Sequence, residues 1–228
     1  MSSKWFSRKT SGILQNFIFD AAEYSITKVS PLMIKNDDIV TIQYTTTKAA
    51  TNDWIGAYSP ADIDITTTVP VKYGWCDDSP SYLATGVGAL EFNFTNLRAD
   101  IAFYYFTGGT SKPTTVAKAS ETVSFANKNE PLRPRVVPTG DVDKLKLLWS
   151  SASSTSPVLR WGVESGIYTS TVAAVSSRID KSDMCGAPAN TKGWRDLGQF
   201  FVFSKYLDYS VYSNTKLKIG YLLCSFAC

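Results

Sequence analysis

Short stretches of alternating apolar and polar side chains, separated by turn-forming residues, run through the first half of the chain. Tyr24–Val29 and Ile39–Tyr44 both alternate in this way, and the turn residues Asn36-Asp-Asp38 lie between them. A two-residue period is typical of strands that bury one face, and Gly, Pro, Asn and Asp favour the turns between strands. Further strands are predicted at Asp53–Tyr58, Val69–Trp75, Ala89–Phe94, Ile101–Phe106, Val116–Ala119 and Thr122–Phe125.

The predicted fold class is all-β, with two consecutive antiparallel β-sandwich modules of the fibronectin III or immunoglobulin type. Strands that recur about every ten residues, with no long helical period, indicate such a sandwich over residues 21–127, after an N-terminal extension at 1–20. Residues 128–135 hold two prolines between polar neighbours and are predicted to be a stiff linker. The second module, 136–198, is expected to be incomplete, with strands at Lys144–Trp149, Val158–Trp161 and Ser170–Val175.

Composition supports a folded protein and narrows the range of its partners. Hydrophobic residues make up 44% of the 228 residues and charged residues 19%, which is enough for a packed core. The net charge is only +3 and the basic residues form no long run, so neither nucleic acid nor a membrane is an expected partner. Arg133 and Arg135 are interpreted as solvated charges, with a small basic recognition patch as the alternative. Residues 1–15 lack the long apolar segment of a secretory signal, so the localisation stays open.

The chain contains no histidine, which removes most of the common catalytic arrangements. Serine and cysteine nucleophiles that depend on a histidine base are excluded, whereas a Ser-Lys or carboxylate-pair mechanism is not. We expect no catalytic, cofactor-binding or metal-binding residue in this chain. The acidic pairs Asp37-Asp38, Asp62-x-Asp64 and Asp77-Asp78 are interpreted as turn residues. Asp62-x-Asp64 is the best alternative for a hard cation, whereas Gly140-Asp141 lies in a turn before a strand and is not expected to bind a metal.

Cysteine and tryptophan each leave an alternative open. Four cysteines permit three full pairings, and a zinc site is the alternative to disulfides, although no Cys-x-x-Cys spacing supports it; the four are Cys76, Cys185, Cys224 and Cys228. Aromatic residues on strand faces commonly pack in a core, but a carbohydrate-binding platform is the alternative. The tryptophans concerned are Trp54, Trp75, Trp149, Trp161 and Trp194.

Asn93-Phe-Thr95 matches the acceptor sequence for N-linked glycosylation. Its place in a strand with alternating apolar neighbours predicts that the Asn93 side chain faces outward. Asn93 is therefore a candidate glycosylation site, provided that the chain reaches an oxidising lumen.

A loop rich in Gly, Pro and Trp, Asp183-Met-Cys-Gly-Ala-Pro-Ala-Asn-Thr-Lys-Gly-Trp-Arg-Asp196, resembles a stretch that lies just ahead of the catalytic domain in the large, plant-type purple acid phosphatases. Other motifs resemble the same family, in the same order, over roughly residues 24–198. They are Asp53-Trp-Ile-Gly-x-Tyr-Ser-Pro60, Pro70-x-Lys-Tyr73, Asn96-Leu-Arg-Ala-Asp100, Phe125-Ala-Asn127, Pro131-x-x-Pro-Arg135, Leu147-Leu-Trp149, Arg160-Trp-Gly162 and Cys185-Gly-x-Pro-Ala189.

The resemblance implies the two N-terminal, fibronectin-like modules of an enzyme family that hydrolyses phosphate monoesters. The complete family uses a binuclear metal centre of iron with zinc, manganese or iron, and it is largely secreted. Its ligands come in motifs of the types Gly-Asp-x-x-Tyr, Gly-Asn-His-Glu and Gly-His-x-His, none of which is in this sequence. We therefore expect a truncated, inactive relative without a cofactor. The alternative is a free-standing β-sandwich that binds a carbohydrate or a protein.

The resemblance ends after Gly198, and residues 199–228 are predicted to be a divergent tail. Without the family's closing strands, the second module would expose sheet edges that invite pairing between chains. No partner is certain, but we expect the full chain to self-associate through this incomplete module. Protease is expected to cut early beyond residue 196, whereas the first module is expected to resist.

Overall fold

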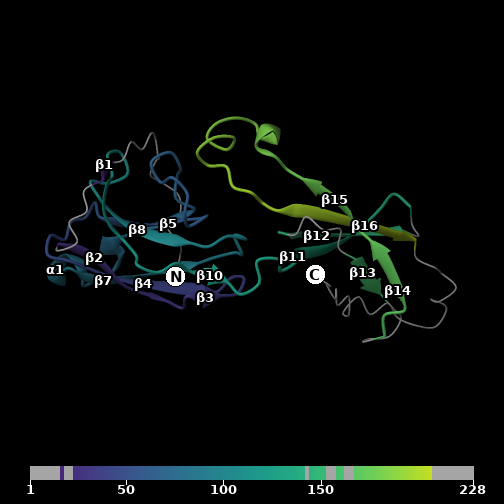
Figure 1. Ribbon diagram of the computed structural model, residues 1–228, viewed down its shortest axis with the longest axis horizontal. Helices are drawn as coiled ribbons and strands as arrows, with labels where there is room; N and C mark the ends of the chain where they lie inside the picture. Colours follow the sequence, from purple (N-terminus) through teal and green to yellow (C-terminus); the bar gives the residue numbers. More distant parts are fainter. Residues whose placement is uncertain (1–15, 18–22, 142–143, 153–157, 162–166, 207–228) are drawn as a thin grey trace. The chain divides into compact units, whose positions relative to one another are not determined.

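Strands dominate both halves of the chain in the computed structural model (Figure 1). The structure describes residues 16–17, 23–141, 144–152, 158–161 and 167–206. Internal contacts divide the chain into two units: Met1–Asn127 with Met184–Trp194, and Lys128–Asp183 with Arg195–Cys228. The predicted all-β fold class is confirmed. In the described ranges no helix is both long and apolar enough to cross a bilayer.

The first unit contains two principal sheets and a short additional pair of strands. A five-stranded sheet has the order β1-β9-β8-β5-β6, a three-stranded sheet has the order β2-β4-β7, and β10 pairs with β3. The elements are β1 (Asn16–Phe17), β2 (Tyr24–Ser30), β3 (Met33–Ile34), β4 (Ile39–Thr46), β5 (Trp54–Tyr58), β6 (Lys72–Trp75), the 3₁₀ turn η1 (Cys76–Asp78), α1 (Tyr82–Thr85), β7 (Val87–Asn93), β8 (Ala102–Thr107), β9 (Thr114–Lys118) and β10 (Ser124–Phe125).

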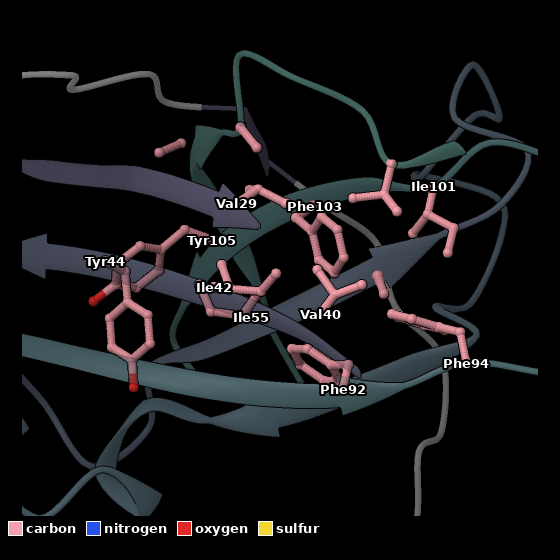
Figure 2. Close-up of a cluster of buried hydrophobic side chains, with 14 of the residues drawn as sticks. Val29, Val40, Ile42, Tyr44, Ile55, Phe92, Phe94, Ile101, Phe103 and Tyr105 are labelled. Carbon is pink, nitrogen blue, oxygen red and sulfur yellow. The ribbon is translucent and has the colours of Figure 1, made fainter. Parts of the chain in front are cut away.

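Alternating burial along the strands builds the core between the two sheets. On β4 the side chains of Val40, Ile42 and Tyr44 are buried, while their neighbours at positions 39, 41 and 43 are not. They meet Phe92 from β7 and, from the larger sheet, Ile55 (Figure 2). The alternation predicted from the sequence for Ile39–Tyr44 is therefore the pattern that closes the sandwich.

The larger sheet of the first unit is buried on its second face as well. All five residues of β5 are buried, as are Ala102–Phe106 in β8. Side chains on the face away from the sandwich core form a second cluster, in which Trp54 and Phe106 stack with ring centroids 4.0 Å apart. Ile63 and Ile65, from the connection between β5 and β6, pack against this cluster. A strand covered on both sides reads as a continuous apolar run, which is why β5 and β8 do not alternate.

The second unit contains a four-stranded sheet, β11-β12-β16-β15, and a two-stranded sheet, β13-β14. Its buried cluster is formed by Leu147, Trp149, Leu159, Ala174, Phe201 and Phe203. The elements are β11 (Leu132–Pro138), β12 (Lys144–Ser151), β13 (Val158–Trp161), β14 (Ser170–Ala173), β15 (Val175–Arg178), the 3₁₀ turn η2 (Lys181–Asp183) and β16 (Gln199–Tyr206). The single strand expected at Ser170–Val175 is divided at the buried Ala174, where the chain passes from one sheet to the other.

The prediction of a linker at 128–135 is wrong for its second half. Leu132–Pro138 forms β11, which pairs with β12 across a register shift between Leu132 and Arg135. Pro134 and Pro138 lack the amide hydrogen that a central strand would need. β11 is an edge strand of its sheet, so its outer side needs no partner and the prolines are accommodated.

The boundary between a second module at 136–198 and a divergent tail at 199–228 is also wrong. Gln199–Tyr206 forms β16, which lies between β12 and β15 and pairs with both. Phe201 is fully buried and Phe203 is 8% exposed, while Ser204 is exposed. This alternation lets β16 fill the position between β12 and β15 with its apolar side chains toward the core. Residues 207–228 lie outside the described part of the chain.

The loop Met184–Trp194 groups with the first unit, although it is connected to the second at both ends. The Val69 amide, just ahead of β6, donates a hydrogen bond to the Lys192 carbonyl at 3.4 Å. Within the loop, Gly193 donates to the Pro188 carbonyl at 2.9 Å. The motif that carried the family resemblance is therefore a defined turn structure that belongs to the first unit.

The burial of Phe201 gives a test of β16. Replacing Phe201 by Ala removes a fully buried ring that stacks on Trp149, so we expect the second unit to lose about 3–5 kcal/mol of stability. Phe200→Ala is the matched control, because Phe200 is only half-buried on the opposite side of the same strand. Urea unfolding followed by pulsed hydrogen exchange in the β12 peptide would measure both losses in the second unit. Equal losses for the two variants would contradict the placement of β16.

Candidate functional site

Asp38 and Asp64, from two of the acidic pairs, lie at turns and accept hydrogen bonds from neighbouring residues, whereas Asp77 and Asp78 lie in η1. Asp64 accepts hydrogen bonds from the Thr66 hydroxyl at 2.6 Å and the Thr66 amide at 2.9 Å, and these bonds lower the pKa of its carboxyl. Asp38 accepts one from the Lys35 amide at 2.7 Å. Within the part of the chain that the structure describes, no group of three or more Cys, Asp or Glu side chains is placed to hold a metal ion.

Asn93 is exposed at the end of β7, so the outward direction predicted for it is confirmed. Its side-chain amide donates a hydrogen bond to the Asp37 carbonyl. The Thr95 hydroxyl donates to the Asp37 carboxylate at 3.2 Å. Both functional groups of the acceptor sequence are thus held by one turn residue, and glycosylation at Asn93 stays a prediction.

The tryptophans divide between core and partly exposed positions. Trp54 is fully buried, and its indole nitrogen donates to the Gly109 carbonyl at 3.1 Å. Trp149 is 3% exposed. These two side chains are core residues and offer no surface to a sugar ring, whereas Trp75 and Trp194 are half-buried. The side chain of Trp161 lies outside the described residues.

The most concentrated chemistry in the structure is a buried polar network around Asp53, immediately before β5. Asp53 is 1% exposed, and its Oδ2 atom accepts a hydrogen bond from the Ala50 amide at 2.9 Å. The Tyr82 hydroxyl, from α1, donates to the same oxygen. The hydroxyl of Tyr105 on β8 contacts the Tyr82 hydroxyl. Because Tyr82 gives its single proton to Asp53, Tyr105 is the donor in the contact between the two tyrosines.

The backbone of η1 extends this network to the smaller sheet. The Cys76 amide donates to the Asp53 carbonyl at 2.9 Å, and the hydroxyl of Tyr44 on β4 donates to the Cys76 carbonyl at 2.9 Å. The Tyr44 ring meets those of Tyr82 and Tyr105 edge-on, with centroids 5.5 Å and 5.8 Å away; two of these tyrosines are visible in Figure 2. Groups from α1, η1, β4 and β8 therefore converge on the turn that begins β5.

Burial controls the protonation of every group in this network. Desolvation raises the pKa of the Asp53 carboxyl, against the opposing effect of the Tyr82 hydroxyl. Desolvation also raises the pKa of the Cys76 thiol far above its usual range, and the nearby Asp53 carboxylate adds to this effect. A thiol in that state does not act as a nucleophile or a metal ligand. The groups of this network stay protonated or buried, so the network exposes no surface to a substrate and no reactive thiolate.

Residues 26–127 match the family described as the Fn3-like domain from purple acid phosphatase. The chain carries the Fn3-like domain of the purple acid phosphatases. The resemblance predicted from the sequence motifs is thereby confirmed, and the matched residues enclose Asp53, Tyr82 and Tyr105.

Curated relatives and a solved structure extend the similarity beyond the Fn3-like domain. The chain is 34% identical over 211 residues to "Probable inactive purple acid phosphatase 1" of Arabidopsis thaliana, which covers 82% of this chain and 34% of the relative. It is 33% identical over 191 residues to "Probable inactive purple acid phosphatase 27" of the same plant. That match covers 75% of this chain and 31% of the relative. A purple acid phosphatase from yellow lupin (Lupinus luteus) seeds has a TM-score of 0.72 at 31% identity, with 78% of this chain and 35% of that chain covered. The chain spans about a third of the length of these relatives.

The sequence analysis missed the tyrosines of this Fn3-like domain as a functional group. Tyr44 and Tyr105 were placed in strands, and Tyr82 follows the turn residues Ser79-Pro-Ser81, where no regular element was expected. One signal was present: Asp53 directly precedes a fully apolar run, where a carboxylate is expensive unless it is bonded. The members of the network are far apart in the sequence, and only the fold brings them together.

The two described cysteines give a test of the network. Cys76 is buried and Cys185 is exposed, and both are free thiols. Because the raised pKa of Cys76 lowers its thiolate fraction by tenfold per unit, we expect iodoacetamide to label Cys76 more than about tenfold slower than Cys185 in the folded chain. Peptide mass spectrometry resolves the two sites, and labelling in urea is the control. Similar rates in the folded state would contradict the burial of Cys76.

Proposed function

We propose that this chain is a non-catalytic part of a purple acid phosphatase family protein, and that the chain alone does not hydrolyse phosphate esters. The observation that carries the proposal is the absence of histidine from all 228 residues. Imidazole nitrogen and carboxylate oxygen are the ligands that suit iron and zinc. A hydrolytic metal centre needs several such ligands to converge, so that the bound water is acidified and oriented.

Two further observations support the proposal. The Arabidopsis relatives are themselves named probable inactive purple acid phosphatases. Asp38 and Asp64, which belong to two different acidic pairs, already accept hydrogen bonds from neighbouring amides. In this proposal the chain contributes a folded β-sandwich scaffold to the family protein and carries no cofactor of its own.

An activity assay combined with metal analysis tests the proposal. We expect no turnover of an aryl phosphate at acidic or neutral pH by the purified chain, with or without added iron, zinc or manganese. Elemental analysis after dialysis against a weak chelator is expected to find far less than one metal ion per chain, because no group of three or more ligands converges in the described part of the chain. The Asp141→Asn variant is the control for the Gly140-Asp141 turn. Metal-dependent turnover that this variant loses would overturn the proposal.

A second role, self-association, is favoured by the edge strand β15. This strand forms one edge of the four-stranded sheet, and all four of its residues are exposed. Val175 is 74% exposed, although it is apolar and lies opposite Val202 of β16. An exposed edge with an apolar residue and unpaired backbone groups is a template for pairing with another strand. We propose that two copies of the chain pair through β15.

A charge at the edge tests this pairing. Lysine on an edge strand opposes strand addition, so we expect Val175→Lys to convert the associated chain to monomer at micromolar concentration, measured by analytical ultracentrifugation. Ile39→Lys is the matched control, because Ile39 is also an exposed apolar residue, 52% exposed, but lies on the central strand β4. A monomeric wild-type chain, or association that survives in Val175→Lys, would refute pairing through β15.

A further inference from the structure

The two oxygen atoms of the Asp53 carboxyl are in different situations. Oδ2 accepts hydrogen bonds from the Ala50 amide and the Tyr82 hydroxyl. Oδ1 is buried and has no hydrogen-bond partner among the residues that the structure describes. An ionised carboxylate that leaves one oxygen unbonded in an apolar core loses hydration without full compensation. A proton added at Oδ1 would remove the charge and leave both bonds to Oδ2 in place.

The described groups that act on Asp53 come from several elements, and none of them is a cation. Tyr82 lies on α1, Tyr105 on β8 and Tyr24 on β2, while Cys76 and Asp77 lie on η1. The hydroxyl and thiol protons of these groups stay on at neutral pH, and Asp77 acts as a second negative charge. Lys48 forms an ion pair with Glu23.

We propose that Asp53 is a buried proton-binding site, and that uptake of a proton there makes the Fn3-like domain more stable in mildly acidic solution than at neutral pH. The proposal rests on the burial of the carboxyl, on the Oδ1 atom that no described residue bonds, and on the lack of a cation among the described groups that act on the carboxyl. It does not depend on the proposed lack of catalysis. The expected behaviour opposes that of an ordinary paired carboxylate, which stabilises a fold as the pH rises.

Proton linkage gives the direction in which the stability of the Fn3-like domain changes with pH. Because burial raises the pKa of Asp53 in the folded chain, the folded state binds more protons than the unfolded state over the interval between the two pKa values. The stability that Asp53 contributes is complete below its unfolded pKa of about 3.9 and is lost as the pH rises through the folded pKa. Tyr24, Tyr44, Tyr82, Tyr105 and Cys76 also have raised pKa values, but their unfolded values lie near 9 or 10, so they are silent in this range.

The experiment is urea unfolding of the full chain at about pH 5, 6 and 7.5, with pulsed hydrogen exchange in the β8 peptide as a readout confined to the first unit. We expect the wild-type midpoint to rise as the pH falls, with the folding equilibrium constant gaining up to about tenfold per pH unit within the titration interval. The neutral variant Asp53→Asn should lose most of this dependence.

Two tyrosine variants distinguish the contribution of the Asp53 network from pH effects on the rest of the chain. Tyr82→Phe removes the hydroxyl that holds the Asp53 pKa down, so its pH dependence should extend to higher pH than that of the wild type. Tyr104→Phe is the matched control, because Tyr104 lies beside Tyr105 on β8 but packs in the cluster on the other face of the sheet. Its pH dependence should equal that of the wild type.

A direct titration keeps the proposal testable if Asp53→Asn does not fold. The carboxyl carbon of Asp53, followed by nuclear magnetic resonance in the wild-type chain, should titrate above the usual range for aspartate. A titration at or below that range would overturn the proposal. So would a pH dependence of stability that Asp53→Asn shares with the wild type.

Discussion

The first unit depends on covering both faces of its five-stranded sheet. β5 and β8 carry buried side chains on both sides, so each strand contributes to the sandwich core and to the outer aromatic cluster. Full burial of one large apolar side chain stabilises a fold by about 1.5–3 kcal/mol, and Trp54, Tyr58, Phe103 and Phe106 are all buried completely. The carboxylate of Asp53, the residue just before β5, is buried in the same unit and is bonded by the Ala50 amide and the Tyr82 hydroxyl.

The backbone is also tightly constrained where α1 meets the smaller sheet. α1 ends at Gly86, which has a φ of 71°, and a Cβ atom there would lie 1.9 Å from the Thr46 carbonyl oxygen. Only glycine fits such an approach in a left-handed conformation. The Thr46 amide in turn donates to the Gly86 carbonyl at 2.8 Å. The end of α1 is thus fixed against β4, which sets the position of Tyr82 over Asp53.

The sequence predicted the strands in which apolar residues alternate strongly. It missed the strands whose formation depends on their place in the sheet. Ile39–Tyr44 and Lys144–Trp149 were recognised because alternation alone identifies a half-buried strand. β11 was missed because prolines normally oppose a strand, and only its place at an edge makes them acceptable. β16 was missed because the family motifs recognised in the sequence stop at Gly198, although Phe201 and Phe203 alternate as a core strand requires.

The Asp53 network could not be predicted from the sequence because its members converge only after the sheets have paired. The network belongs to the folding of the sandwich and not to the phosphate chemistry for which the family is named. A metal centre for phosphate hydrolysis needs several convergent ligands, whereas Asp53 bonds with the Ala50 amide and Tyr82 inside the sandwich. A buried carboxylate held by hydroxyls and an amide, without a cation, costs more stability than it returns while it is charged. Its bonds nevertheless tie β5, α1 and, through Tyr105, β8 to one geometry. The titratable chemistry of this unit therefore acts on the stability and uniqueness of the fold, and it does so without any ligand of the family's metal centre.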